Sequence, residues 1–276
     1  MSETLSLCAN EVRRYDWERF ICTLFAPAGR REDLYTLLAF NSELARTREM
    51  VTEPLIGEMR LQWWRDAIGG IYDGSRHEVS GHYVLKHLPG VIRRRELSKD
   101  LFDQLIEARL VDLSDQPPAD IEVLLSYARN SSSALNLLQL EVLGHRDIFE
   151  DRAEDLGMAW ALTGLMRAVP ALGKRGRSPL PASLTPAERD LTVMDKDVCR
   201  AVEAVCTEAR RRLEKAALQK SADKPEVRSL FLLGPLCRTY LNKFSRAGYD
   251  PSAPALQQSR AKLQVTLWIR ALLGAY

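Results

Sequence analysis

Apolar residues recur along most of the chain at spacings of three and four. Representative runs are Leu34, Leu37, Leu38 and Leu44; Met59, Trp63, Ala67 and Ile71; and Leu101, Leu105, Ala108 and Leu113. This spacing places side chains on one face of an α-helix. No stretch shows the sustained period-two alternation of β-branched residues that marks a strand. The sequence therefore predicts an all-α fold.

Glycine- and proline-rich segments divide the chain between these apolar runs. They fall at residues 26–29, 52–54, 69–81, 115–118, 144–146, 173–186, 221–225 and 248–254. About eight helices remain between the breaks. No low-complexity linker divides the chain. No internal repeat with a period of about 20–50 residues is visible. We therefore expect a single domain over residues 1–276.

Composition and charge exclude several functional classes. The formal net charge is only +2, so no large positive field is present to attract nucleic acid. The five cysteines form no CxxC pair, which is typical of reduced thiols in a reducing compartment. The start, "MSETLSLCANEVRRYDWERF", resembles neither a signal peptide nor a transit peptide. We expect a cytoplasmic protein that binds no nucleic acid.

Membrane contact, if it occurs, is expected to be peripheral. No run of eighteen apolar residues is present. The last segment, "KLQVTLWIRALLGAY", is strongly apolar, and as a free amphipathic helix it could touch a membrane surface. Few cations flank it, so docking against the protein body is the favoured interpretation. Any membrane contact is expected at the inner (cytoplasmic) membrane.

Two local patterns make specific structural predictions. His77, His82 and His87 recur every five residues, which does not keep one helical face, so we expect no metal site there. In "RLQWW", the apolar face is predicted to contain Met59, Trp63 and Ala67. Trp64 then points elsewhere, against a neighbouring helix, a partner or a lipid interface, and we favour core packing.

A stripe of small residues stands out in the predicted helix over 151–169. Gly157, Ala161, Gly164 and Ala168 follow spacings of four, three and four. Each glycine costs a helix about 1 kcal/mol relative to alanine, so tertiary contacts must support this segment. Small residues on one stripe permit close helix packing or a lined cavity, and we favour close packing.

The same region resembles a known family. The run "LGMAWALTGLMRAVPALGKRGRSPLP", residues 156–181, is similar to the second signature of the squalene/phytoene synthase family, which is close to LGxALQLTNILRDVxEDxxRGRxYLP. The matching residues include Leu156, Gly157, Leu162, Thr163, Arg167, Val169, Arg175, Gly176, Arg177, Leu180 and Pro181. The resemblance implies an isoprenoid synthase-like helical bundle around a central cavity.

Family enzymes join two prenyl diphosphates head to head. Two aspartate-rich motifs hold Mg²⁺, because a departing diphosphate needs hard cations to neutralise its charge. In this chain Ala168, Ala171 and Leu172 stand at the acidic positions of the second motif. Ala161 and Gly164 stand at the family's glutamine and asparagine. None of these side chains can ligate a metal.

The first motif should follow the Ala-Phe step in "LLAFNSELARTREMV". A pattern near AFxRxxDDxxD places Ser42 at the arginine, Ala45 and Arg46 at the paired aspartates, and Glu49 at the third. Only Glu49 keeps a carboxylate, and Arg46 adds a positive charge. The resemblance therefore implies no catalytic residue, no metal ligand and no cofactor; Mg²⁺ is expected only if the chain is an enzyme. Glu49 with Glu53, at i and i+4, is the alternative acidic pair.

Some family positions that bind substrate are retained. Arg167, Arg175 and Arg177 stand where the family binds diphosphate, and Tyr240 aligns with a tyrosine near the enzyme pocket. With Glu49 they are the candidate substrate-binding residues, since arginine forks suit phosphate oxygens. The competing interpretation is helix capping, surface pairing and packing.

One branch of the family resembles the chain more than the enzymes do. The segments "AFNSEL", "IGEMRLQWWRDAI" and "YARNSSSALNLLQLEVLG" are similar to the branch that contains the mitochondrial complex I assembly factor. That resemblance implies respiratory complex subunits or assembly intermediates as partners. Three hypotheses remain open: a non-catalytic assembly factor, a prenyltransferase that condenses two prenyl diphosphates, and a carrier of a lipid or isoprenoid.

Overall fold

A computed structural model describes residues 5–75, 81–185, 195–219, 224–257 and 259–272. Every regular element within these ranges is a helix, which confirms the predicted all-α fold. The helices run from α1 to α14, more than the expected eight. Single residues at Asp16, Arg46 and Leu232 interrupt runs that the sequence pattern joins.

The chain forms two compact units, each built from three segments. The first contains Met1–Ser114, Ala134–Glu150 and Ser221–Leu230. The second contains Asp115–Ser133, Asp151–Lys220 and Phe231–Tyr276. Helices α10 and α12 each contribute residues to both units.

The first unit is organised around α3, a helix buried on nearly every side. Its helices are α1 (Leu7–Tyr15), α2 (Trp17–Thr23), α3 (Ala28–Ala45), α4 (Thr47–Met50), α5 (Pro54–Tyr72), α6 (Leu88–Arg95), α7 (Lys99–Val111), α9 (Ala134–Leu143) and the short η3 (Pro225–Val227). Helix α3 packs against α1, α2, α6, α7 and α9. Since the α3 residues from Asp33 to Leu44 are all buried, this helix forms the core of the unit.

An aromatic cluster joins α3, α5 and α7. The Phe40 ring meets the Trp64 ring edge-on at 5.2 Å and the Phe102 ring at 5.3 Å. Trp64 is fully buried, whereas Met59 is 66% and Trp63 37% exposed. The predicted apolar face of this helix was therefore wrong for Met59 and Trp63, whereas the core packing of Trp64 is confirmed. The buried stripe instead contains Leu61, Trp64, Ala67, Ile68 and Ile71.

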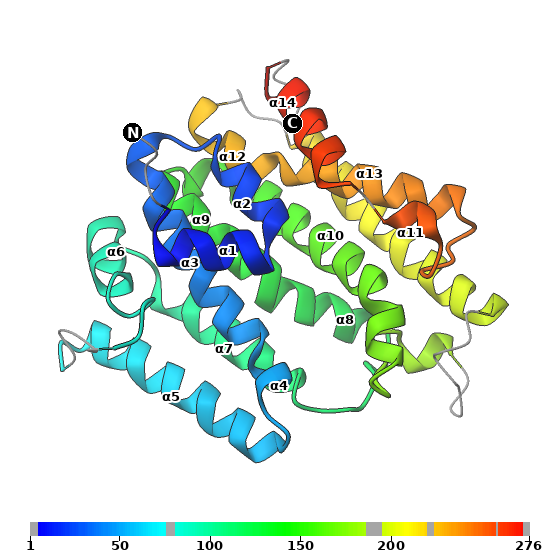
Figure 1. The fold of residues 1–276 in the computed structure, drawn as a ribbon, viewed down its shortest axis with the longest axis horizontal. Coiled ribbons are helices and arrows are strands. Elements are labelled where there is room, and N and C mark those ends of the chain that lie inside the picture. Colours follow the sequence, from blue (N-terminus) through cyan, green and yellow to red (C-terminus); the bar gives the residue numbers. More distant parts are fainter. Residues whose placement is uncertain (1–4, 76–80, 186–194, 220–223, 258, 273–276) are drawn as a thin grey trace. The chain divides into compact units, whose positions relative to one another are not determined.

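The second unit contains the long helix that carries the second signature. Its elements are α8 (Ile121–Ala128), the π-helical turn η1 (Arg129–Ser133), most of α10 (Arg146–Gly173), η2 (Ala182–Leu184), α11 (Lys196–Leu218), α13 (Leu233–Arg246), η4 (Pro254–Leu256) and α14 (Arg260–Leu272). The short α12 (Arg228–Phe231) leads into α13. Helix α13 packs against α11 and α14, as Figure 1 also shows.

Helix α10 is longer than the predicted helix over 151–169. It begins at Arg146 and continues through Pro170 to Gly173. Proline lacks the backbone N–H that would bond four residues back, but near a helix end the loss is limited to that one bond. The turn continues because the Lys174 N–H donates to the Pro170 carbonyl, with an N–O distance of 3.3 Å.

The small-residue stripe of α10 has two different environments. A Cβ added at Gly157 would lie 2.5 Å from the Ser133 Cα, so this glycine allows η1 and α10 to approach closely. The Ser133 hydroxyl reinforces the contact by donating to the Glu154 carbonyl at 2.7 Å. At Gly164, a Cβ would meet nothing within 4 Å. Close packing is thus confirmed at Gly157 and wrong at Gly164.

The carboxy-terminal helix docks on its own unit, as predicted. Leu263, Leu267 and Ala271 of α14 are buried, and the helix packs on α13. Its opposite face leaves large apolar side chains about half exposed: Val265, Trp268 and Ile269. Among the described residues, no helix is both long enough and apolar enough to cross a bilayer.

The two glycines of α10 give a matched test of this packing. We expect Gly157→Ala to lower the free energy of unfolding by about 1–3 kcal/mol, because the new methyl group meets backbone that cannot yield easily. Gly164→Ala should raise it by about 0.5–1 kcal/mol, because alanine is the better helix former and has open space. Urea unfolding measures both, and equal effects would contradict the assignment.

Candidate functional site

The end of α3 carries the residues that align with the first metal motif. Ala45 is the last residue of α3, and Arg46 links it to the short α4. The Arg46 guanidinium carbon lies 3.6 Å from the centre of the Tyr15 ring, and its Nη1 lies 3.9 Å from Glu11 Oε2. This cation is thus held by an aromatic face and a carboxylate of α1.

Glu49 and Glu53, the alternative acidic pair, do not share a helix. Helix α4 ends at Met50, Val51 is extended, and α5 begins at Pro54. A residue that precedes proline is driven out of the helical region, and Glu53 has φ −108° and ψ 133°. The i, i+4 prediction is therefore wrong, and both glutamates are exposed.

A buried carboxylate that sequence reasoning missed lies on α3. Glu43 Oε2 pairs with Arg60 Nη2 at 2.7 Å, and Glu43 Oε1 accepts a hydrogen bond from the Tyr83 hydroxyl at 2.8 Å. His82 Nε2 lies 3.9 Å from Glu43 Oε2, which is beyond hydrogen-bonding distance. We therefore assign the effect of His82 on the pKa of Glu43 to charge and not to a hydrogen bond. No local sequence signal marked this residue, because Arg60 and Tyr83 lie 17 and 40 residues further along the chain.

These neighbours change the acidity of Glu43. His82, then Tyr83 and Arg60, lower its pKa from the ordinary 4.5 to about 2, against the opposing effect of burial. The carboxylate is therefore ionised and satisfied within its own unit. We assign it a structural role.

The face of α10 that aligns with the second metal motif carries no acidic side chain. Ala161, Gly164 and Ala168 are half-exposed there. Further along, Ala171 is exposed and Leu172 is half-exposed. This face can offer apolar contact, but it supplies no oxygen ligand from its side chains.

Two predicted site residues are brought together in the second unit. The Arg167 guanidinium carbon lies 3.9 Å from the centre of the Tyr240 ring, a cation–π contact between α10 and α13. Tyr240 is buried, and the Trp160 ring meets it edge-on at 6.4 Å. The contact supports the packing interpretation for Tyr240 while leaving Arg167 half-exposed.

The Arg-Gly-Arg segment forms the turn that ends α10. Gly176 has φ +70°, a conformation that favours glycine, and the N–H groups of Arg175 and Arg177 both donate to the Leu172 carbonyl. Arg177 Nε lies 3.5 Å from Asp115 Oδ1, whereas Arg175 is exposed. Formation of this turn is thus a structural role that accounts for the Arg-Gly-Arg motif without a ligand. Whether these arginines bind substrate stays a prediction.

The histidine pattern is only partly described. His77 lies outside the described residues, and His82 Nε2 lies 3.9 Å from the Glu43 carboxylate. In the part of the chain that the structure describes, no group of three or more histidine, cysteine, aspartate or glutamate side chains is arranged to hold a metal ion.

Comparison with known proteins establishes the family. A family model described as squalene/phytoene synthase matches residues 12–268. The chain belongs to the squalene/phytoene synthase family. The match spans segments of both compact units.

Two relatives match almost the whole length of this family member at 31% identity. The bovine (Bos taurus) protein named NADH dehydrogenase (ubiquinone) complex I, assembly factor 6 is 31% identical, and the match covers 100% of this chain and 84% of the relative. A Drosophila melanogaster protein named as its homolog is also 31% identical, over 98% of this chain and 84% of the relative.

Solved structures of low sequence identity support the same fold. A dehydrosqualene synthase matches with a TM-score of 0.81 at 16% identity, over 98% of this chain and 96% of that one. A squalene synthase from Alicyclobacillus acidocaldarius matches with a TM-score of 0.77 at 19% identity, over 89% and 94%. The family member therefore has the isoprenoid synthase-like helical fold that the resemblance implied.

The role of Glu43 can be tested through pH. Its pKa is lowered on folding, so its stabilisation is present above about pH 4.5 and is lost as pH falls toward 2. We expect Glu43→Gln to lower the free energy of unfolding by roughly 1–3 kcal/mol at pH 7, with the difference from wild type shrinking toward pH 2–3. Urea unfolding at several pH values measures this.

Glu107→Gln is the control for this experiment, because Glu107 pairs with Arg65 at an exposed position. It should change the unfolding free energy by less than about 1 kcal/mol at pH 7. A Glu43 variant as stable as this control at pH 7 would contradict the structural assignment.

Proposed function

We propose that this chain is a non-catalytic member of its family that serves the assembly or maintenance of respiratory complex I. The observation that carries the proposal is that one sequence combines two features: similarity to named assembly factors and non-acidic residues at most metal-motif positions. Relatives named complex I assembly factor 6 match it over 98–100% of its length. At the aligned metal motifs, the chain has Ala45, Arg46, Ala168 and Leu172.

Electrostatics supports the non-catalytic part of the proposal. Ionisation of a prenyl diphosphate leaves negative charge that divalent cations must neutralise, and these cations need several carboxylate oxygens. Of the aligned positions only Glu49 keeps a carboxylate, and it is exposed. Arg46, three residues before it in sequence, contacts Glu11 and Tyr15.

A peripheral location at the inner (cytoplasmic) membrane fits this role, since complex I is a membrane enzyme. The outward face of α14 supports the proposal with Val265, Trp268 and Ile269, each more than half exposed. Tryptophan and aliphatic side chains on one helical face suit the boundary between headgroups and acyl chains.

Deletion of the gene tests the assembly role. We expect membranes from the deletion strain to oxidise NADH more slowly and to contain less assembled complex I, with both restored when the gene returns. Succinate oxidation should stay unchanged, because it enters the chain after complex I. Normal NADH oxidation and normal complex I content in the deletion strain would refute the role.

Fractionation of the complemented strain tests the location. The protein should sediment with membranes and be released by alkaline carbonate, as peripheral proteins are. Replacing Trp268 and Ile269 with glutamate should shift it to the soluble fraction, whereas Leu218→Glu, at another exposed apolar position, should not. A protein that stays soluble throughout would contradict the peripheral proposal.

An assay for catalysis tests the competing prenyltransferase function. Purified protein with Mg²⁺ and farnesyl or geranylgeranyl diphosphate should yield no squalene or phytoene above a heat-denatured control. An active dehydrosqualene synthase, run in parallel, confirms that the substrates are sound. Product formation by this chain would overturn the non-catalytic proposal.

The lipid-carrier alternative rests on different residues from the assembly role and is tested by a different measurement. Arg167 remains half-exposed on the same helix as the open, small-residue positions around Gly164. A prenyl lipid that remains bound in native mass spectrometry after gentle purification would favour this function. It is compatible with an assembly role, since a bound lipid can stabilise a non-catalytic scaffold.

A further inference from the structure

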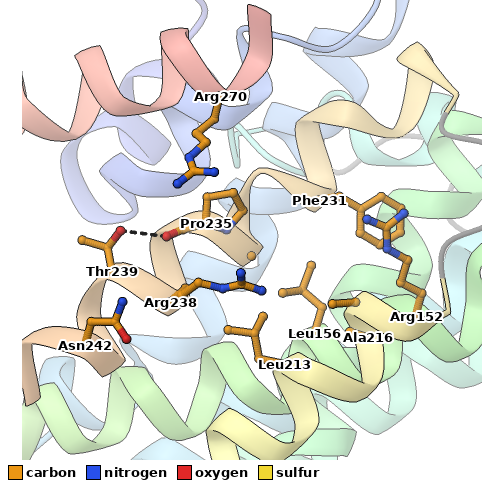
Figure 2. A pocket seen from close by; sticks show the side chains of 12 residues that line it. Arg152, Leu156, Leu213, Ala216, Phe231, Pro235, Arg238, Thr239, Asn242 and Arg270 are labelled. Carbon is orange, nitrogen blue, oxygen red and sulfur yellow. Dashed lines mark hydrogen bonds between the residues drawn. The ribbon is translucent and has the colours of Figure 1, made fainter. Parts of the chain in front are cut away.

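The second unit contains a pocket formed wholly by its own helices. It has a volume of about 520 Å³ and lies among α10, α11, the end of α12, α13 and α14. Its size falls in the range of small-molecule sites. Figure 2 shows arginines that enter from different helices above an apolar floor. The floor includes Leu156, Leu213 and Phe231.

The charge of the lining is positive. Arg152, Arg238 and Arg270 line the pocket, and the lining contains no aspartate or glutamate. Arg152 is buried, and its guanidinium carbon lies 3.9 Å from the centre of the Phe231 ring. Arg238 and Arg270 have no ion pair or hydrogen bond with any described residue. A lining that contains arginines and no carboxylate favours a bound anion.

The remaining polar groups also favour an anion. Asn242 Oδ1 already accepts from Arg210 Nη1 at 3.2 Å, so its amide NH₂ is the part left to bind a ligand. The Thr239 hydroxyl donates to the Pro235 carbonyl at 2.8 Å (Figure 2). The rim therefore presents mainly donors, which suit an acceptor-rich group such as phosphate.

The absence of a side chain at Gly234 keeps the floor open. A Cβ built there would lie 3.8 Å from Leu213 Cδ1 and 3.9 Å from Leu156 Cδ1, in ordinary contact with both. A methyl group at this position would therefore fit against the two leucines and would cover part of the pocket floor. An apolar floor below a cationic rim matches a molecule with an alkyl segment and a charged end.

We propose that this pocket binds a phosphate ester that carries a short apolar chain, with Arg238 and Arg270 holding the phosphate. The ester could be a soluble metabolite or the headgroup of a phospholipid. Both share the chemistry that the pocket recognises, and the experiment separates them. The site is independent of the aligned metal motifs and of the complex I role.

Calorimetric titration of the full chain tests the proposal with three probes: inorganic phosphate, hexyl phosphate and hexanol. Hexyl phosphate should bind at least tenfold more tightly than phosphate, because its chain reaches the apolar floor. Hexanol, which lacks the charge, should not bind measurably. Equal affinity for phosphate and hexyl phosphate, or tight binding of hexanol, would overturn the proposal.

Variants assign the binding to the pocket. Arg238→Ala with Arg270→Ala should weaken hexyl phosphate binding by about tenfold or more for each arginine. Arg246→Ala is the matched control, since Arg246 is an exposed arginine of the same helix outside the pocket. Gly234→Ala should weaken hexyl phosphate more than phosphate. Equal loss in the Arg246 variant, or no loss in the double variant, would refute the site.

Vesicles identify the source of the phosphate. The wild-type protein is mixed with phosphatidylcholine vesicles that contain phosphatidylglycerol and then sedimented. Sedimentation with the vesicles indicates a lipid headgroup if the double arginine variant loses it and Arg246→Ala keeps it. Binding of hexyl phosphate without vesicle binding indicates a soluble ester. Both outcomes support the proposal, whereas failure to bind either probe overturns it. A thermal melt of each variant checks that folding is retained.

Discussion

The structure depends on pairing each buried carboxylate with a cation of its own unit. In the part of the chain that the structure describes, the buried acidic residues are Asp33, Glu43 and Asp155. Asp33 pairs with Arg94 and Arg95 at 2.7 Å each, Glu43 with Arg60 at 2.7 Å, and Asp155 with Arg212 at 3.2 Å and Lys215 at 3.0 Å. Leaving such a charge unpaired inside a protein costs several kcal/mol, so these pairs are constraints on the fold.

This use of acidic residues bears on our functional proposal. An enzyme that ionises a diphosphate must keep carboxylates available for metal ions, at the expense of repulsion among them. Here the buried carboxylates are neutralised by arginine and lysine. Three residues before Glu49 the chain carries a cation, Arg46, which contacts α1. The charges of the chain thus support a stable scaffold, which is the property that an assembly factor needs.

Much of the fold could be predicted from the sequence, because periodicity and the second signature are local patterns. The all-helical class, the family and the docking of the last helix all follow from such patterns. The face of α5 could not be chosen correctly, since two apolar stripes compete on it and only the contact of Trp64 with Phe40 decides between them. The open space at Gly164 was also hidden, because sequence gives no distance to neighbouring helices.

The site was less predictable for physical reasons. Glu49 and Glu53 have helical spacing, but Pro54 ends that helical path through its effect on the preceding residue. Glu43 draws its partners from positions 17 and 40 residues away, so no local motif marks it. The pocket lined by Arg152, Arg238 and Arg270 takes its residues from separate segments of the chain, so no single run of sequence could predict it. Tertiary contacts, rather than motifs, decide these features.

The central claim is that this scaffold does not assemble the divalent-ion cluster that diphosphate chemistry requires. Mn²⁺ prefers the same carboxylate ligands as Mg²⁺, and electron paramagnetic resonance reports its free form directly. We predict that excess protein leaves the free Mn²⁺ signal unchanged, both alone and with a non-hydrolysable farnesyl diphosphate analogue, relative to the same samples without protein. A loss of that signal that requires the protein and is reversed by Mg²⁺ would contradict the account.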